Sequence, residues 1–113
     1  MSARTDFQVQ TDAAARSWLE SHPAAERRVL AYAVKRCCGG RKICTVQVRN
    51  QSRRDDVSRH AAVVIDGRTE LLIDPRAAAR LPARFGLTVR GLGPLKHLDL
   101  VLDGGQWGRL LYD

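Results

Sequence analysis

A series of short apolar segments separated by turn residues limits most strongly what this sequence can fold into. The segments RVLAYAVKR (28–36) and ICTVQVR (43–49) each predict a strand, since the first is an apolar run between charges and the second alternates. Residues 60–74 contain two apolar stretches around Asp66-Gly67, a dipeptide that favours a tight hairpin turn. We expect the other strands at residues 7–10, at 87–90, through Leu98, Leu100 and Leu102, and after a turn at Gly104-Gly105.

Two short helices are predicted between these strands. Thr11 can cap a helix whose apolar stripe is Ala15, Trp18 and Leu19. Asp74 followed by Pro75 at the first helical position begins another. The sequence lacks the regular alternation of strand and helix that a Rossmann fold needs. About seven short strands and two short helices therefore predict an α+β domain that is mainly β, with antiparallel pairing.

The length of the chain is that of one domain. We expect its 113 residues to form a single domain, 1–113, with a polar, mobile loop at about 50–59. No window approaches the roughly 18 consecutive apolar residues of a membrane-spanning helix, and the segment MSARTDFQVQ has no apolar core of the kind found in signal peptides. We therefore expect a cytoplasmic protein with no membrane partner.

The chain is basic, with 19 Lys and Arg against 12 Asp and Glu and a formal net charge of +7. Such a charge favours weak association with nucleic acid or other polyanions. The cations are spread in pairs instead of one long run, and aromatic residues make up only 5% of the chain, so a base-stacking surface has few rings to build on. We therefore interpret the positive charge as that of a basic, soluble surface instead of a nucleic-acid-binding one.

Two adjacent cysteines, Cys37 and Cys38, form the most informative motif. Neighbouring side chains of a strand point to opposite faces, so the two thiols can reach one atom only if the backbone turns, and Gly39 and Gly40 allow that turn. Cations nearby in the sequence favour the thiolate, which is both the nucleophile and the metal ligand. Those cations are Lys35, Arg36, Arg41 and Lys42.

Cys44 allows two interpretations. On its alternating strand it shares a face with Val46 and Val48, so it can pack in the core or act as a third ligand. Three thiolates leave a tetrahedral metal one ligand short. A histidine, water, a small thiol or a second subunit would then have to complete the site.

The other polar residues predict no further site. No histidine has a partner at metal-site spacing, so structural or surface roles are expected for His22, His60 and His97. Asp55 and Asp56 are expected to be solvated in a charged loop, and Trp107 and Tyr112 to pack in the core or at a sheet edge. No hydrolytic motif occurs, so the protein is more readily interpreted as a non-enzyme.

The order of these elements resembles the HesB-like, A-type iron–sulfur carrier family. The likeness covers roughly residues 7 to 81 and rests on three segments: FQVQTDAAARSWLES, VLAYAVKRCCGG and VVIDGRTELLIDPRAAARL. Within it, Cys38 takes the place of the family's first cysteine, and Cys37 that of the glycine before it. The adjacent pair is more similar to a HesB-like subgroup with a vicinal Cys-Cys or Cys-selenocysteine motif.

The resemblance implies a compact HesB-like β-sandwich and a tendency to form a homodimer. The family ends in a Cys-x-Cys motif that completes its cluster site, whereas this chain ends DGGQWGRLLYD without a cysteine. Two facing subunits could supply the missing ligands.

Three functional hypotheses follow. The first is a carrier or sensor that binds iron, an iron–sulfur cluster or another soft metal through Cys37 and Cys38, with Cys44 as a further ligand, and exchanges it with a partner protein. The second is a thiol redox or detoxification protein in which Cys38 is the nucleophile and Cys37 or Cys44 resolves the product. The third, ranked last, is a basic nucleic-acid-binding module.

Overall fold

The computed structural model describes residues 7–22, 27–36, 42–65 and 69–112, apart from the side chains of residues 35, 36, 42 and 43. Within these ranges the chain forms seven strands, three α-helices and one 3-10 helix, which is an α+β fold dominated by strands. Their order is β1 (Gln8–Thr11), α1 (Ala13–Ser21), β2 (Arg28–Arg36), β3 (Lys42–Asn50), β4 (Ala61–Ile65), β5 (Thr69–Ile73), α2 (Pro75–Ala78), β6 (Arg84–Arg90), η1 (Gly93–Leu95), β7 (His97–Val101) and α3 (Gly104–Tyr112).

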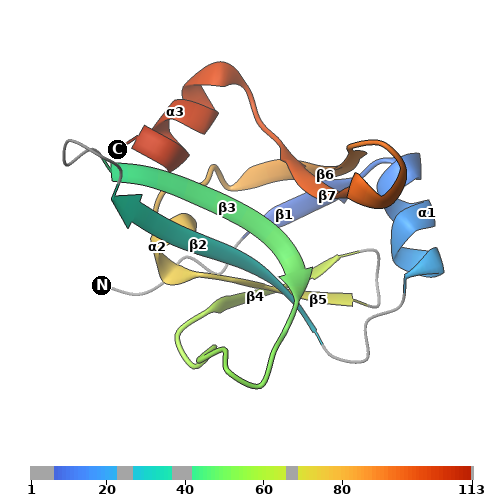
Figure 1. Cartoon of the computed structure of the whole chain (residues 1–113), viewed down its shortest axis with the longest axis horizontal. Coiled ribbons are helices and arrows are strands. Elements are labelled where there is room, and N and C mark those ends of the chain that lie inside the picture. Colours follow the sequence, from blue (N-terminus) through green and yellow to red (C-terminus); the bar gives the residue numbers. More distant parts are fainter. Residues whose placement is uncertain (1–6, 23–26, 37–41, 66–68, 113) are drawn as a thin grey trace.

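The strands form two sheets (Figure 1). One sheet has four strands in the order β3-β2-β5-β4, and the other has three in the order β1-β6-β7. The antiparallel pairs β2/β3, β4/β5 and β6/β7 confirm the predicted antiparallel hairpins. Two pairs are parallel, β1 with β6 and β2 with β5, and for these the expectation of antiparallel pairing was wrong. The physical reason is that the partners in these two pairs are not consecutive strands, so no tight turn makes them antiparallel and longer crossover connections join them.

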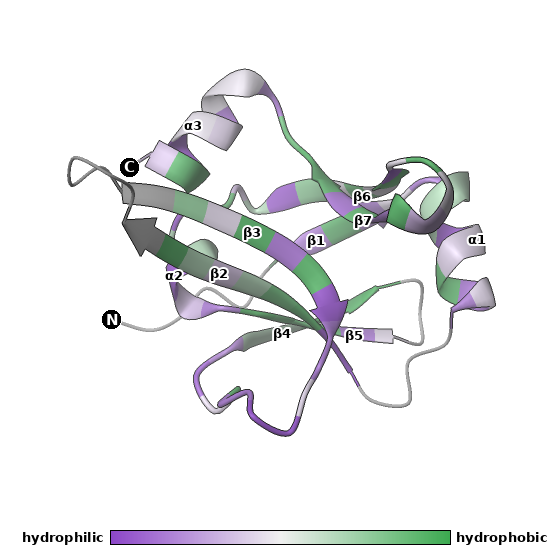
Figure 2. Ribbon diagram, viewed as in Figure 1, coloured by the Kyte–Doolittle hydropathy of each residue, from purple (hydrophilic) through white to green (hydrophobic). Residues whose placement is uncertain are grey.

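One hydrophobic cluster joins the two sheets and the helices. Its fully buried leucines and isoleucines come from the four-stranded sheet, the three-stranded sheet and α3, and include Leu30, Leu71, Ile73, Leu87, Leu100 and Leu110. Figure 2 shows apolar residues concentrated on the strands, while the loop after β3 is hydrophilic. Burial of this apolar surface is the main favourable contribution to folding. No helix among the described residues is long and apolar enough to cross a membrane.

The first helix begins one residue later than predicted. Asp12, not Thr11, is its N-cap, because the Asp12 carboxylate accepts a hydrogen bond of 2.7 Å from the backbone N–H of Ala15. Ala15 and Leu19 are buried, which confirms the predicted apolar stripe, whereas Trp18 is only partly buried at its margin. The second predicted helix is confirmed as α2, with Asp74 as its cap.

The C-terminal segment is a helix, α3, and the prediction of a last strand was wrong. Asp103 accepts a hydrogen bond from the Gln106 N–H at 2.8 Å, and the Gln106 side chain accepts one from the Asp103 N–H at 3.0 Å. This reciprocal pair is a capping box, which starts a helix despite the two glycines. Trp107 packs against the core as predicted, but Tyr112 is 83% exposed and does not pack there.

Candidate functional site

The β2/β3 hairpin carries the chain's three cysteines. Its ladder runs from the pair Arg28–Asn50 to the pair Arg36–Lys42, and residues 37–41 connect the last pair. The strand before the cysteine pair, β2, ends at Arg36, as the sequence predicted. The predicted site residues Cys37, Cys38, Gly39, Gly40 and Arg41, and the side chains of Lys35, Arg36 and Lys42, lie outside the described part of the structure and remain predictions.

Cys44 lies on the inner face of this hairpin. It is paired with Val34 and shares its face with Val46 and Val48, as its alternation in the sequence predicted. The side chain is partly buried and packs against the hydrophobic cluster. It also lies close enough to the Tyr32 side chain to contribute to the raised pKa of that hydroxyl, so its position combines core packing with a polar neighbour.

Tyr32 connects Cys44 to two helices. Its hydroxyl donates a hydrogen bond to the carbonyl of Leu110 in α3 at 3.3 Å. The guanidinium groups of Arg76 and Arg80 lie 5.2 and 5.6 Å from the centre of its ring, within the range of cation–π contacts. Burial first, and then the neighbouring side chain of Cys44, raise the pKa of Tyr32 above its usual value, so its hydroxyl stays protonated.

Arg76 and Arg80 are site residues that the sequence analysis did not identify. Arg76 donates a hydrogen bond of 2.6 Å to the Tyr32 carbonyl and pairs with Asp74, whose carboxylate raises the pKa of Arg76. Their spacing of four residues was visible in the sequence, although α2 ends at Ala78 and Arg80 lies in the turn after it. The contact of Arg76 with Tyr32 was not visible in the sequence, because it depends on the parallel pairing of β2 with β5.

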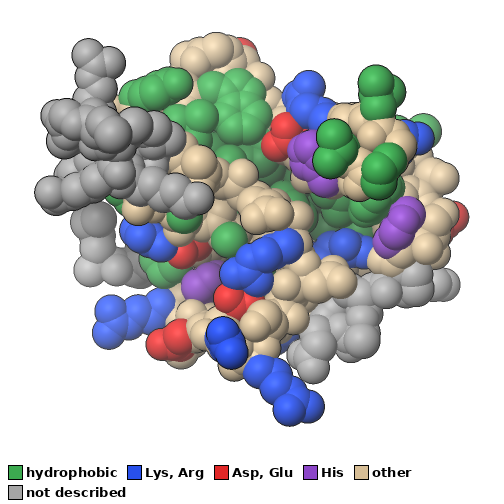
Figure 3. All heavy atoms as spheres, viewed as in Figure 1, with side chains coloured by type: hydrophobic (Ala, Val, Ile, Leu, Met, Phe, Trp, Pro, Cys, Tyr) green, Lys and Arg blue, Asp and Glu red, His purple; other side chains and the backbone are tan. Residues whose placement is uncertain are grey.

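A groove of about 680 Å³ opens beside Cys44. It lies between β3, the η1 turn, β7 and α3, and its lining residues are Cys44, Thr45, Val46, Gln47, Pro94, Leu95, Lys96, His97, Leu98, Asp99, Trp107 and Leu111. Figure 3 shows hydrophobic side chains at the surface over α3 and over the η1 turn. Cys44 is thus reachable from solvent. Within the described ranges, no three His, Cys, Asp or Glu side chains come together in a way that could hold a metal ion.

The three histidines have the structural or surface positions expected of them. His22 caps the end of α1 and stacks on Trp18, with 3.8 Å between ring centroids. His60 precedes β4, and His97 begins β7 at the edge of the groove. None of the three is hydrogen-bonded to Cys44 in the part of the chain that the structure describes.

Asp55 is not simply solvated, and that expectation was wrong. Its carboxylate accepts two hydrogen bonds from Arg49, at 2.7 and 2.8 Å, and a third from the backbone N–H of Ser52 at 2.7 Å. Arg49 first, then Ser52, hold the pKa of Asp55 far below its usual range. The segment after β3 is a loop, as predicted, and these contacts connect it to the strand.

Comparison with known proteins identifies no family. No family model matches the chain, and no curated protein matches it. Among solved structures, Escherichia coli SufA, a protein "Involved in Biosynthesis of Iron-sulfur Clusters", is similar over 81% of this chain and 77% of its own, with 12% sequence identity and a TM-score of 0.43. These values are too low to assign a family or a function.

Proposed function

We propose that this protein is a small cytoplasmic carrier or sensor that binds iron, an iron–sulfur cluster or another soft metal through Cys37 and Cys38. Cys44 acts as the third thiolate. The observation that carries the proposal is that all three cysteines of the chain belong to one hairpin, two of them in the connection between Arg36 and Lys42 and the third two residues beyond it. Thiolates are the ligands that soft metals and iron–sulfur clusters prefer.

The surroundings of Cys44 support a site that exchanges its cargo. Its side chain lines an open groove, so a metal or cluster bound there could be passed to a partner protein. The Arg76 guanidinium, which pairs with Asp74 and lies over the Tyr32 ring, places a cation in the same neighbourhood as Cys44. The thiol of Cys44 is a donor of the kind that the proposed cargo needs.

The ligand set is completed by a second subunit in this proposal. The sequence resemblance to A-type carriers equates Cys38 with the family's first cysteine, but the C-terminal cysteines of that family have no counterpart here. The segment after Asp103 forms α3 and contains no thiol. Two hairpins facing each other in a homodimer would supply enough thiolates for one cluster.

Anaerobic purification tests the proposal. We expect isolated or reconstituted protein to contain iron and acid-labile sulfide in near-stoichiometric amounts and to show charge-transfer absorbance. Cys37→Ser and Cys38→Ser should lose that absorbance, and Cys44→Ser should weaken it. An apo dimer, or dimerisation on reconstitution, would be seen by sedimentation.

A colourless protein that stays free of iron, sulfide and other metals after reconstitution would overturn the proposal. Thiol labelling of the same samples then examines the redox alternative. A single hyper-reactive thiol that disappears in Cys38→Ser is the result expected for a nucleophilic cysteine.

A further inference from the structure

The side of β3 that faces away from β2 is the edge of a sheet. β3 is the last strand of the four-stranded sheet, and within the described residues it pairs only with β2. In an antiparallel pair, alternate residues direct their backbone N–H and C=O groups away from the partner strand. An edge of this kind can accept a further strand, and proteins usually cover or blunt it.

The groove beside Cys44 runs along this edge. Its lining includes four consecutive residues of β3, 44–47. Consecutive side chains of a strand point to opposite faces, so a groove that touches all four residues lies against the backbone edge between the faces. In agreement, Cys44 and Val46 are partly buried, whereas Thr45 and Gln47 are exposed. No backbone hydrogen bond joins these four residues to a described strand other than β2.

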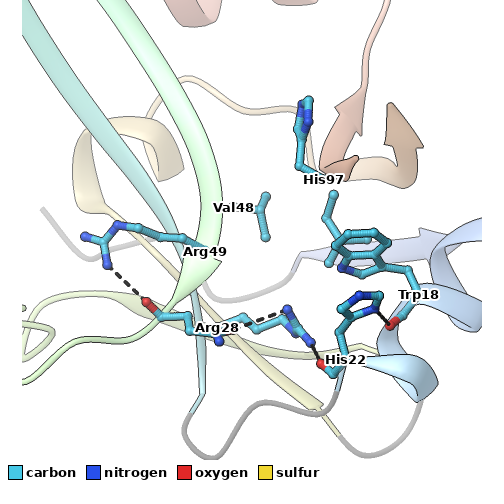
Figure 4. Close-up of a pocket in the computed structure, with 8 residues that line it drawn as sticks. Trp18, His22, Arg28, Val48, Arg49 and His97 are labelled. Atoms are coloured by element: carbon cyan, nitrogen blue, oxygen red, sulfur yellow. Dashed lines mark hydrogen bonds between the residues drawn. The ribbon is translucent and has the colours of Figure 1, made fainter. Parts of the chain in front are cut away.

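The open space beside β3 continues past the groove. His97 and Leu98 of β7 line the groove and also a pocket of about 400 Å³ next to Arg28. Figure 4 shows this pocket, which includes residues 48–50 of β3 in its lining. Space therefore lies beside seven consecutive residues of β3, 44–50, which is roughly 24 Å of strand. That length suits an extended occupant.

The walls of the groove opposite β3 are apolar. Trp107 and Leu111 of α3 line it and pack against the hydrophobic cluster. Leu95, in η1, is a lining residue that is 75% exposed, and nearby Leu92 is 83% exposed. Figure 3 shows hydrophobic side chains gathered over this turn. Such a surface favours an occupant with apolar side chains.

The charge that the groove offers to an occupant is positive. Lys96 is an exposed lining residue, and no carboxylate pairs with it in the described part of the chain. The exposed imidazole of His97 follows it. Asp99 also lines the groove, but its carboxylate pairs with Arg90 at 2.9 Å and accepts a hydrogen bond from the Leu100 N–H at 2.8 Å. An acidic group would therefore be attracted to Lys96.

We propose that this groove binds an extended peptide segment of a partner protein, which adds to the sheet as a strand beside β3. The segment carries apolar side chains on one face and acidic ones on the other. A polypeptide backbone is the ligand that presents N–H and C=O groups at the spacing of a strand edge. The apolar side chains lie against Trp107 and Leu111, and the acidic face meets Lys96 at the rim.

A second copy of this chain is a poorer occupant of the same edge. β3 itself contains Lys42 and Arg49 and no acidic residue, and the whole chain has a net charge of +7. Two such edges would bring like charges together, whereas an acidic segment complements them. The proposal concerns backbone pairing and needs no metal, so it does not rest on the proposed thiol site.

Fluorescence anisotropy with labelled peptides tests this site. The probe is an acetylated peptide of about seven residues in which valine and glutamate alternate, and the control peptide has lysine in place of glutamate. Reduced, chelator-treated protein is titrated at an ionic strength of about 0.15 M, so that metal is absent and unspecific charge effects are screened. We expect saturable binding of the glutamate peptide, about tenfold tighter or more than that of the lysine peptide.

Methylation of the peptide backbone separates strand pairing from charge attraction. N-methyl groups on alternate residues block one of the two edges of the peptide and leave its charge unchanged. The apolar face fixes the register, so only one edge of the peptide can pair with β3. Methylation of that edge should abolish binding, and methylation of the other edge should largely preserve it.

Two variants at the groove change exposed side chains and should leave the melting temperature unchanged. Lys96→Glu reverses the charge and should weaken binding of the glutamate peptide about tenfold. Leu95→Ser removes an apolar contact and should weaken it less. Arg53→Glu makes the same charge reversal in the exposed loop after β3 and is the matched control, with unchanged binding expected.

Four outcomes would overturn the proposal. They are the absence of saturable binding of the glutamate peptide, equal binding of the two methylated peptides, equal weakening by Lys96→Glu and Arg53→Glu, and a dimer of the free protein that the peptide dissociates. The last result, seen by sedimentation, would assign the edge to a second copy. Because the titration uses metal-free protein, its failure is distinct from a failure of the iron and sulfide analysis.

Discussion

Tyr32 and Cys44 are diagonal neighbours on the inner face of the β2/β3 ladder, and the Cys44 side chain adds to the effect of burial in raising the pKa of the Tyr32 hydroxyl. The tyrosine is 5% exposed, and burial is the larger of the two effects that raise its pKa. Removing the thiol should therefore lower the pKa of Tyr32 without restoring its usual value of about 10.

The phenolate absorbance of a Tyr112→Phe protein measures this prediction, because Tyr32 is then the only tyrosine. Cys44→Ala in that background should titrate at lower pH than its parent. Thr45→Ala changes an exposed neighbour on the opposite face and should leave the titration unchanged. A curve for Cys44→Ala that coincides with its parent would show that the Cys44 side chain has no effect on the pKa of the Tyr32 hydroxyl.

The Arg49–Asp55 pair predicts a loss of stability in acid. The pKa of Asp55 is lowered in the folded protein, so its carboxylate stabilises the fold above the unfolded-state value of about 3.9. This contribution is lost as the pH falls from there towards the folded-state pKa. Asp55→Asn should lower the free energy of unfolding by about 1 kcal/mol at neutral pH. It should also reduce the difference in that free energy between pH 7 and pH 3.

Urea unfolding at about pH 7 and pH 3 compares the two proteins. Glu20→Gln removes a carboxylate from an exposed helical position and is the matched control. Equal acid sensitivity of wild type and Asp55→Asn would mean that the pair does not contribute to folding stability.

The capping box of α3 predicts that Asp103 is important to the C-terminal helix. Asp103→Ala removes the acceptor for the Gln106 N–H and should lower the free energy of unfolding by about 1 kcal/mol. Asp103→Ser retains a capping oxygen and should recover most of that loss. Denaturant midpoints and far-ultraviolet circular dichroism measure both; equal midpoints for Asp103→Ala and wild type would contradict the assignment.

Two glycines before β7 predict different costs for the same substitution. Gly91 has a φ of 93°, and a Cβ there would collide with the carbonyl oxygen of Leu95. Gly93 has a φ of 57° with no atom near its Cβ position. Gly93→Ala should lower the free energy of unfolding by about 1 kcal/mol from backbone strain alone. Gly91→Ala should lower it distinctly more, because the Cβ also collides with the backbone. The melting temperatures of the two variants, measured side by side, check this prediction. A lower melting temperature for Gly93→Ala than for Gly91→Ala would contradict the described conformation of the turn.

Local patterns were sufficient for the elements that begin and end with clear sequence signals. The strand at 28–36 was predicted with its observed bounds because charges flank an apolar run, and Asp74-Pro75 marked α2. At the C-terminus two signals competed. Gly104-Gly105 suggested a turn, while Asp103, Gln106 and the spacing of Trp107 with Leu110 indicated a helix, and the capping box prevailed.

Contacts between distant segments were beyond what those patterns could predict. The parallel pairing of β2 with β5 brings Arg76 to Tyr32, and neither residue carries a local signal of the other. The pocket at Arg28 is similar, since it needs α1, β2, β3 and β7 together. Of the candidate site, alternation predicted the face of Cys44, whereas its place diagonal to Tyr32 required the register of the hairpin.

The pairing of β1 with β6 has a consequence for the order in which the chain can fold. Gln8 is paired with Arg84, and the ring of Phe7 meets that of Phe85 edge-on at 5.9 Å. During synthesis the first strand therefore has no partner until most of the chain has left the ribosome. The β2/β3 and β4/β5 hairpins can form earlier, because their contacts are close in sequence. Closure of the three-stranded sheet is then a late step, and the apolar side chains of Phe7 and Val9 stay exposed to solvent until it occurs.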